Sequence, residues 1–325
     1  MTQSETEMLP LIPKPADNYF DLVIIGGGPA GLSAALYGAR GNVSTLLIEK
    51  GLPGGELNNT EEVENYPGLD HLKGPQIGEM MTEHARRFGA YFQELTTIRS
   101  IDLKSQPKII ETDQGQFKAR SVIIATGSEH RKLNVPGEKE LAGKGVSYCA
   151  VCDGAFFKNK HVVVVGGGNA AVEEGNFLTR YASKVTLVHR RDTLRAEKII
   201  QTRATNNPKM NFIWWTTVEE IIGDALGVTK VKLKNVQTGE VSELACDGVF
   251  IYVGLEPNIE LFKEQIELDE GNRVITSEKL ETNIPGVFAA GDVRVTPLRQ
   301  AVTAAADGSL AATTAISFIE GLEVH

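Results

Sequence analysis

The sequence predicts an α/β protein that contains two similar units, each made of a buried strand, a glycine-rich turn, a helix and a second strand. Two observations support this prediction: the pattern begins near residue 21 and again near residue 160, and both copies keep the same spacing. A third observation is a Cys-x-x-Cys pair just before the second copy. A chain of 325 residues is also long enough for two domains.

The first copy opens with the apolar run 21–25, which is typical of a buried parallel strand. A helix begins within 32–37, and a strand at 45–48 ends at Glu49, 21 residues after the second glycine of the turn. An acid at this place binds a ribose hydroxyl. Together these features predict a dinucleotide-binding unit of the Rossmann type. The glycines that fit G-x-G-x-x-G are Gly26, Gly28 and Gly31.

Between the copies the sequence predicts loops, a helix and short strands. The Gly- and Pro-rich segments 51–57 and 63–68 predict loops, which either wrap the far end of a long cofactor or simply connect elements. Residues 74–93 carry apolar side chains at helical spacing. The run 121–127 predicts another buried strand that ends in a tight turn.

The second copy differs from the first in charge. Strands at 160–165 and 184–188 flank its turn, and the second strand ends at His189, again 21 residues after the second glycine. Here Arg190 and Arg191 stand in place of the acid. An acid would repel a 2′-phosphate, whereas the forked donors of arginine bind one, so this copy fits NADPH; the alternative is a solvated basic turn. The turn residues are Gly166, Gly168 and Ala171.

The pair Cys149 and Cys152 is the centre of the predicted chemistry. Two cysteines at this spacing can cycle between a disulfide and a dithiol, one thiol can have a lowered pKa, and the adjacent Asp153 can carry protons. The alternatives are a structural disulfide or half of a zinc site. Zinc needs four ligands, and the only other cysteine is Cys246, which we expect in the core. We therefore expect Cys149 and Cys152 to form a redox-active pair and not to bind a metal.

The C-terminal third adds strands and one helix. Residues 212–215 and 247–254 predict buried strands. The strand within 286–292 delivers Asp292 to a turn that suits hydrogen bonding to a cofactor, and an Ala-rich helix after 299–302 adds its N-terminus to the same site.

Composition excludes several classes. The net charge of −9 and the lack of a basic stripe argue against nucleic acid. No uninterrupted apolar run approaches the roughly 20 residues that cross a bilayer, so we expect no membrane. Three cysteines suit a reducing, cytoplasmic compartment. Residues 1–19 are interpreted as a mobile extension and not as a signal peptide.

From about residue 20 to the C-terminus these motifs resemble the low-molecular-weight thioredoxin reductases of bacterial type. The resemblance implies two Rossmann-like domains, the second inserted in the first: an FAD-binding domain at 20–128 and 255–325, and an NADPH-binding domain at 129–254 that carries the cysteines. It also implies a homodimer and thioredoxin, or a thioredoxin-like protein, as partner.

The resemblance also assigns site residues. Cys152 would face the flavin, Cys149 would attack thioredoxin and Asp153 would transfer protons. The FAD residues would be Gly26, Gly28, Pro29, Ala30, Gly31, Glu49, Gly55, Asn65, Thr126, Gly127, Gly291, Asp292, Arg299, Gln300 and Ala301. The NADPH residues would be Gly166, Gly168, Asn169, Ala170, Ala171, His189, Arg190, Arg191 and Arg195.

The chain departs from the family pattern at a few positions. Glu56 replaces a usual glutamine, Ala306 and Ser309 replace a common glycine and cysteine, and the N-terminal extension is longer than usual. The expected function is transfer of electrons from NADPH through FAD and the Cys149–Cys152 disulfide to a protein disulfide. Alternatives are an FAD-dependent dithiol oxidase, a ferredoxin-linked reductase, and a redox sensor that binds NADPH without turnover.

Overall fold

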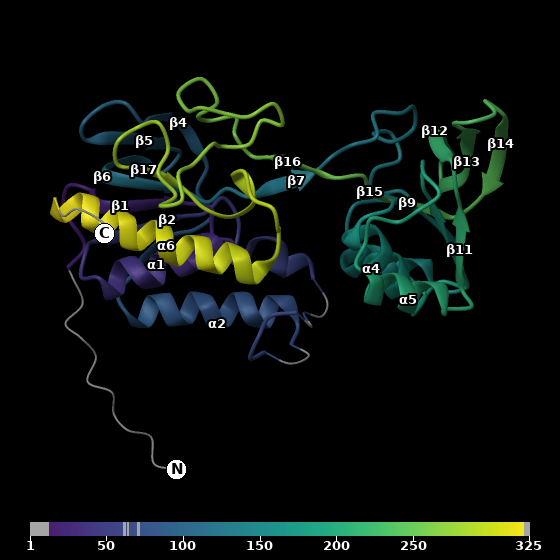
Figure 1. Cartoon of the computed structure of the whole chain (residues 1–325), viewed down its shortest axis with the longest axis horizontal. Coiled ribbons are helices and arrows are strands. Elements are labelled where there is room, and N and C mark those ends of the chain that lie inside the picture. The colour runs from purple at the N-terminus through teal and green to yellow at the C-terminus, as the bar shows by residue number, and fades with distance from the viewer. Residues whose placement is uncertain (1–12, 61–62, 64, 70–71, 322–325) are drawn as a thin grey trace, which may run out of the picture. The chain divides into compact units, whose positions relative to one another are not determined.

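The computed structural model describes residues 13–60, 63, 65–69 and 72–321, so most of the predicted extension 1–19 lies outside the described residues. The chain forms two compact units (Figure 1). The first unit comprises the residues up to Ser128 and those from Pro257, and the second comprises Glu129–Glu256. The second crossing therefore falls two residues later than the expected boundary after Gly254.

The first unit is built on a seven-stranded sheet in the order β3-β2-β1-β6-β5-β4, with β17 also paired to β6. Strands β3, β2, β1, β6 and β17 are parallel, and β5 and β4 run antiparallel to their neighbours. Central strand β1 is covered on both faces, which explains why its sequence is a continuous apolar run. The strands are β1 Tyr19–Ile25, β2 Thr45–Ile48, β3 Tyr91–Gln93, β4 Ile98–Asp102, β5 Lys108–Thr112, β6 Gly115–Ile124 and β17 Val287–Ala289.

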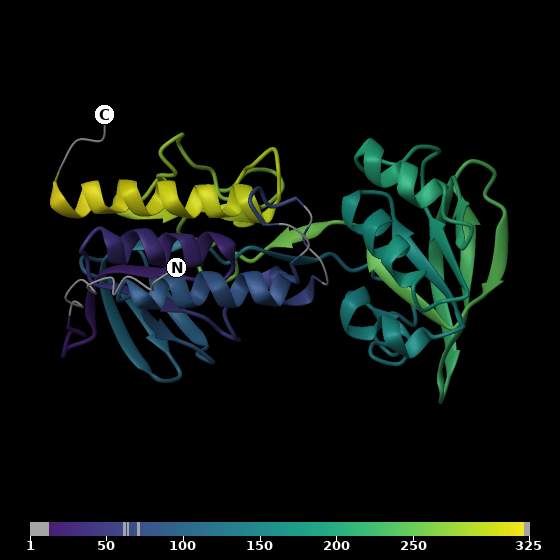
Figure 2. The same ribbon diagram turned by 90° about the horizontal axis from the view of Figure 1, so that it is seen from below.

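Three long helices cover one side of this sheet. Helix α1 (Pro29–Arg40) packs between α2 (Gly74–Arg87) and α6 (Ala301–Glu320), as Figures 1 and 2 show. Short 3-10 helices lie at η1 (Gly55–Asn59) and η3 (Gly291–Val293). Helix α6 has the length and mean hydropathy (1.3) of a membrane span. Its alanine face packs in the core against α1, as expected for a core helix of a folded domain.

The second unit repeats the same architecture on a smaller scale. Its parallel sheet has the order β11-β10-β9-β15-β8, and a separate antiparallel sheet contains β12, β13 and β14. The strands are β8 Val146–Ser147, β9 His161–Gly166, β10 Lys184–Val188, β11 Met210–Ile213, β12 Thr216–Asp224, β13 Gly227–Asn235, β14 Val241–Ala245 and β15 Gly248–Tyr252. The helices are α3 Ala150–Asp153, η2 Gly154–Phe157, α4 Asn169–Leu178 and α5 Lys198–Thr205.

The two segments that cross between the units pair with each other. Strand β7 (Ser128–His130) and strand β16 (Leu255–Pro257) form a two-stranded sheet. Hydrogen bonds continue at both ends of this pair, from Asn258 N–H to the Gly127 carbonyl and from Arg131 N–H to the Gly254 carbonyl.

The predicted α/β class with two parallel-sheet units is confirmed, but three local predictions were wrong. The helix expected over 74–93 ends at Arg87, because Gly89 adopts a left-handed φ of +94° and the aromatic residues that follow join the sheet as β3. The segment 51–57 runs into the 3-10 helix η1 and is not only loop. Strand β11 stops at Ile213, and the two tryptophans after it are half-buried.

Candidate nucleotide and disulfide sites

The first glycine turn joins β1 to α1, and its backbone leaves an open cradle. A Cβ at Gly31 would lie 1.8 Å from the Gly26 carbonyl oxygen, so only glycine allows α1 to start this close to β1. A Cβ at Gly28 would meet nothing closer than 3.9 Å, the Cα of Gly55. The fold therefore brings Gly55 to the open side of the turn, although 27 residues of sequence separate it from Gly28.

Glu49 lies directly against this turn. Its carboxylate accepts hydrogen bonds from the N–H of Gly27 (2.6 Å) and of Gly51 (2.7 Å). The acid predicted at the end of β2 is thus held beside the helix N-terminus, a position from which a carboxylate can reach a ribose hydroxyl.

The C-terminal part of the first unit packs on the same turn. Gly291, with φ +77°, approaches Ala30, where an added Cβ would lie 3.0 Å from the alanine Cβ. A Cβ at Gly308 in α6 would lie 1.9 Å from the Ala30 carbonyl oxygen. Asn65 Nδ2 donates to Gln300 Oε1 at 2.9 Å. Residues assigned to FAD from four separate segments therefore gather around the start of α1.

Asp292 has an unusual electrostatic setting. Burial raises the pKa of its carboxyl to about 6; nearby Arg299 opposes the rise, and the carboxylates of Asp307 and Glu56 add to it. The Nε of Arg299 is buried and forms no hydrogen bond with any described residue. Glu56, which replaces the family's glutamine, thus acts on the predicted flavin site through its charge.

The other two departures fall elsewhere on the first unit. Ala306 and Ser309 line a groove of about 400 Å³ among α1, α2 and α6, together with Leu36, Tyr37 and Met81.

The second glycine turn repeats the first, with a histidine in place of the acid. A Cβ at Gly168 would meet nothing within 4 Å, so this turn also has an open cradle. A Cβ at Gly167 would lie 2.3 Å from the ring of His189, which is therefore packed directly under the turn. The neighbouring Arg195 N–H donates to the Gly167 carbonyl at 2.7 Å.

A basic cluster surrounds this histidine. Burial, followed by the charges of Arg195, Arg190 and Arg191, lowers the pKa of His189 and keeps its ring neutral at pH 7. Nε2 of the ring is buried without a hydrogen-bond partner among the described residues. The three arginines are exposed and form no ion pair with described acidic side chains. Their charges therefore remain available to an anion.

The redox segment follows β8 in the second unit. Cys149 is disulfide-bonded, whereas the side chain of Cys152 lies outside the described residues. The Cys149 N–H donates to Ser147 Oγ (3.0 Å), and the Ala150 N–H donates to the hydroxyl of buried Tyr252 (2.9 Å). These two contacts satisfy backbone donors at the start of the short helix α3, so they fix the chain around the cysteine.

A buried carboxylate holds the residue before the cysteine. Glu138 is 4% exposed and accepts a 2.6 Å hydrogen bond from the Tyr148 hydroxyl. It also accepts from the backbone N–H groups of Leu133, Asn134 and Val135. The segment that follows the first crossing is therefore tied to the redox motif.

Sequence reasoning missed these supporting residues. Glu138, Tyr252 and Asp307 belong to no motif, and their contacts with Tyr148, Ala150 and Gly291 join residues that lie 10 to 102 positions apart in the sequence. Only the position of Tyr148 next to Cys149 could have drawn attention to it. The solitary Cys246 was placed correctly: it is a buried free thiol whose pKa burial raises to about 12. Among the described residues no cluster of His, Cys, Asp or Glu is suited to a metal ion.

Two nucleotide cradles of opposite charge and a disulfide-bonded cysteine define a dinucleotide-dependent disulfide oxidoreductase. Residues 20–308 match the family model described as pyridine nucleotide-disulphide oxidoreductase. The chain belongs to this family.

Similar proteins agree on the same class. Thioredoxin reductase of Listeria innocua is 53% identical, covering 94% of this chain and 96% of that protein. Thioredoxin reductase of Bacillus subtilis is 51% identical, covering 94% and 97%. The crystal structure of Lactococcus lactis thioredoxin reductase matches with a TM-score of 0.91 and 49% identity, over 93% of this chain and 100% of that chain. The resemblance stated from the motifs is thereby confirmed.

Proposed function

We propose that this chain is an NADPH-dependent thioredoxin reductase that uses FAD. The observation that carries the proposal is that the disulfide-bonded Cys149 belongs to the unit whose glycine turn has arginines beside it. The glycine turn of the other unit has the carboxylate of Glu49 beside it. The relatives of about half identity that are named thioredoxin reductase support the same assignment.

The first unit fits FAD. The turn is uncrowded at Gly28, where a pyrophosphate would approach the start of the helix, and Glu49 is placed for a ribose. The unpartnered Nε of Arg299 offers a donor to a bound group. When bound, FAD supplies the two-electron transfer between nicotinamide and disulfide.

The second unit fits NADPH. Its turn is open at Gly168, and the exposed Arg190, Arg191 and Arg195 would bind the 2′-phosphate. A dithiol oxidase or a ferredoxin-linked reductase has no need for such a cluster, so the arginines weigh against both alternatives.

The cysteines would pass electrons on by thiol–disulfide exchange. The thiolate of Cys149 attacks one sulfur of an oxidised partner, and that partner's other sulfur leaves as a thiolate that takes up a proton. Cys152 then attacks Cys149 in the mixed disulfide, which re-forms the internal disulfide and releases the reduced partner. Asp153, which directly follows Cys152 in the sequence, would transfer protons.

The surface after the motif suits a protein partner. Phe156 is 75% exposed, while the adjacent Phe157 is buried. An exposed aromatic ring close to the redox segment is a common anchor for a partner surface. This ring supports thioredoxin, or a thioredoxin-like protein, as the electron acceptor.

We also propose that the enzyme is a homodimer, as the resemblance implies, and that it is cytoplasmic, as its three cysteines suggest. Light scattering on the purified holoenzyme tests the dimer: a mass near 35.2 kDa, that of one chain, would contradict it.

One assay tests the function. Anaerobic NADPH should bleach the flavin absorbance, and oxidised thioredoxin should restore it with stoichiometric formation of free thiols. Cys149→Ser should bleach but not recover with thioredoxin. Bleaching without recovery in the parent enzyme would support a sensor without turnover, and a failure of NADPH to bleach would favour the other two alternatives.

A further inference from the structure

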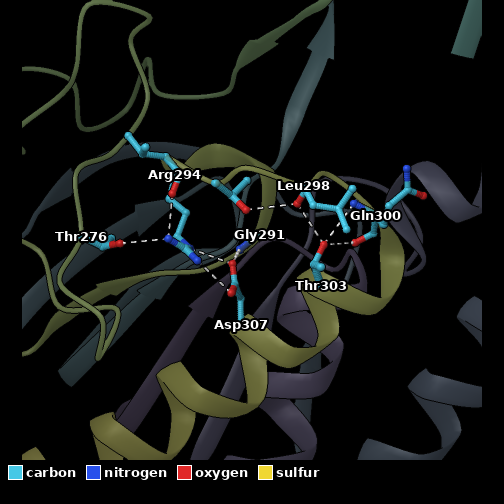
Figure 3. Close-up of polar contacts among 9 residues, drawn as sticks. Thr276, Gly291, Arg294, Leu298, Gln300, Thr303 and Asp307 are labelled. Carbon is cyan, nitrogen blue, oxygen red and sulfur yellow. Dashed lines mark hydrogen bonds and ion pairs between the residues drawn. The ribbon is translucent and has the colours of Figure 1, made fainter. Parts of the chain in front are cut away.

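The most enclosed ion pair between described residues lies beside the predicted flavin turn. Arg294 and Asp307 are 17% and 15% exposed, less than the two partners of any other such pair. The guanidinium donates from Nε to Oδ2 (2.7 Å) and from Nη2 to Oδ1 (3.0 Å), so the pair is bidentate (Figure 3). Such forked pairs fix orientation as well as distance.

The same carboxylate holds the other end of the turn. Oδ2 of Asp307 also accepts the Gly291 N–H at 3.0 Å. Gly291 is the first residue of η3, and Arg294 follows its last residue. The carboxylate of Asp307 on α6 therefore binds both ends of the segment that contains Asp292 (Figure 3). Asp292 lies between these two contacts, and its carbonyl oxygen accepts a third one from Ser128 Oγ (3.0 Å).

The guanidinium of Arg294 also binds residues outside η3, Thr276 and Val295. Its Nη1 donates to Thr276 Oγ1 (3.3 Å) and to the Val295 carbonyl (2.8 Å), so all three nitrogens of Arg294 are engaged. At the start of α6, Thr303 Oγ1 accepts the N–H of Gln300 (3.1 Å) and caps the helix that carries Asp307 (Figure 3). Two groups of residues assigned to FAD, around Asp292 and around Gln300, are thereby joined through one rigid helix.

We propose that Asp307 is a positioning residue of the flavin site, which acts through Arg294 and the Gly291 N–H to hold the Asp292 turn in the orientation that binds FAD. This inference rests on the proposed FAD binding by the first unit. It assigns a function in cofactor binding to a residue that belongs to neither nucleotide motif.

The chain supplies a matched control. Asp269 also binds an arginine through two guanidinium nitrogens, although Nε and Nη2 of Arg273 both donate to Oδ2, while Oδ1 accepts the backbone N–H groups of Gly271 (2.9 Å) and Arg273 (2.8 Å). It lies in the same unit and is about as enclosed, at 20% exposed. None of its contacts is a residue assigned to FAD, so Asp269→Asn measures the general cost of losing such a carboxylate.

The test compares FAD affinity in four variants of the full chain. Apo-enzyme is titrated with FAD, and quenching of flavin fluorescence gives Kd, while the visible circular dichroism of the bound flavin reports its surroundings. We expect Asp307→Asn and Arg294→Met each to raise Kd about tenfold or more and to alter the dichroism. Asp269→Asn should leave both unchanged, and Asp292→Ala should weaken binding as a positive control. The melting temperatures of apo Asp307→Asn and apo Asp269→Asn should fall alike.

An unchanged Kd and spectrum in Asp307→Asn would overturn the proposal. A raised Kd in Asp307→Asn together with normal FAD binding by Asp292→Ala would also overturn it, because Asp307 would then not act through the Asp292 turn. The proposed function would still stand in both cases. A parent enzyme that binds no FAD would overturn both. If Asp307→Asn does not fold, Arg294→Lys replaces it, because lysine keeps the positive charge but cannot form the bidentate contact. An unchanged Kd for FAD in both Arg294→Lys and Arg294→Met would then refute the proposal.

Discussion

We expect Glu138→Gln to destabilise the second unit by about 3–6 kcal/mol, since hydrogen bonds to a charged group are worth about 1.5–3 kcal/mol each. Each carboxylate oxygen of Glu138 accepts two of its four hydrogen bonds, from Leu133 and Tyr148 on one side and from Asn134 and Val135 on the other. Glutamine keeps the shape, but its NH₂ group cannot accept, so two donors lose their acceptor whichever way the amide turns. At 4% exposure, water cannot readily replace it.

The two tryptophans make this prediction measurable. Trp214 and Trp215 are the only tryptophans of the chain, and both belong to the second unit. Their fluorescence during urea unfolding therefore reports that unit, while release of flavin reports the first. The tryptophan transition should move to lower urea in Glu138→Gln, and the flavin transition should stay.

Tyr148→Phe provides the graded comparison. It removes one of the four hydrogen bonds and leaves three N–H donors on the carboxylate, so it should cost about 1.5–3 kcal/mol. Because Tyr148 directly precedes Cys149, both variants should also slow thioredoxin reduction. An unfolding free energy of Glu138→Gln within about 0.5 kcal/mol of the parent, the range of an ordinary surface substitution, would refute the reasoning.

Three further predictions concern the cofactors and the thiols. Replacing Arg190 and Arg191 by methionine should lower kcat/KM for NADPH about tenfold or more and leave NADH nearly unchanged; an equal loss with both would mean that the arginines only support the structure. Cys152→Ser should trap a mixed disulfide with thioredoxin on gel electrophoresis and Cys149→Ser should not, and the reverse pattern would exchange the two roles. The pKa of Asp292 is raised from 3.8 to about 6, so its contribution to apo-enzyme stability should fall as pH rises through this window, and Asp292→Asn should remove that fall in denaturation curves.

The sequence predicted best where chemistry is local. Gly31 must be glycine because of an atom five residues earlier, and the spacing alone identifies such turns. The same holds for β1, whose burial on both faces requires a continuous apolar run.

The rest depends on contacts that no local pattern encodes. Asp307 meets Gly291 only because Gly308 lets α6 approach the start of α1, and Tyr148 meets Glu138 only after the chain has turned back. The helix expected to reach residue 93 failed for a related reason: 91–93 pairs with β2, and this tertiary pairing outweighed the helical spacing.

The two units show how one geometry serves two nucleotides. In each, the residue that ends the second strand lies under the middle of the glycine turn: Glu49 bonds the Gly27 N–H, and the ring of His189 packs against Gly167. The open turn at Gly28 recurs at Gly168, so charge at the end of the second strand is one feature by which the two units differ toward a 2′-phosphate. Glu49 brings a carboxylate that repels a 2′-phosphate, whereas the pKa of His189 is lowered by burial first and then by the arginines, whose charges attract such a phosphate. Discrimination for or against a 2′-phosphate is therefore expected to depend on the residues that follow the second strand of each unit.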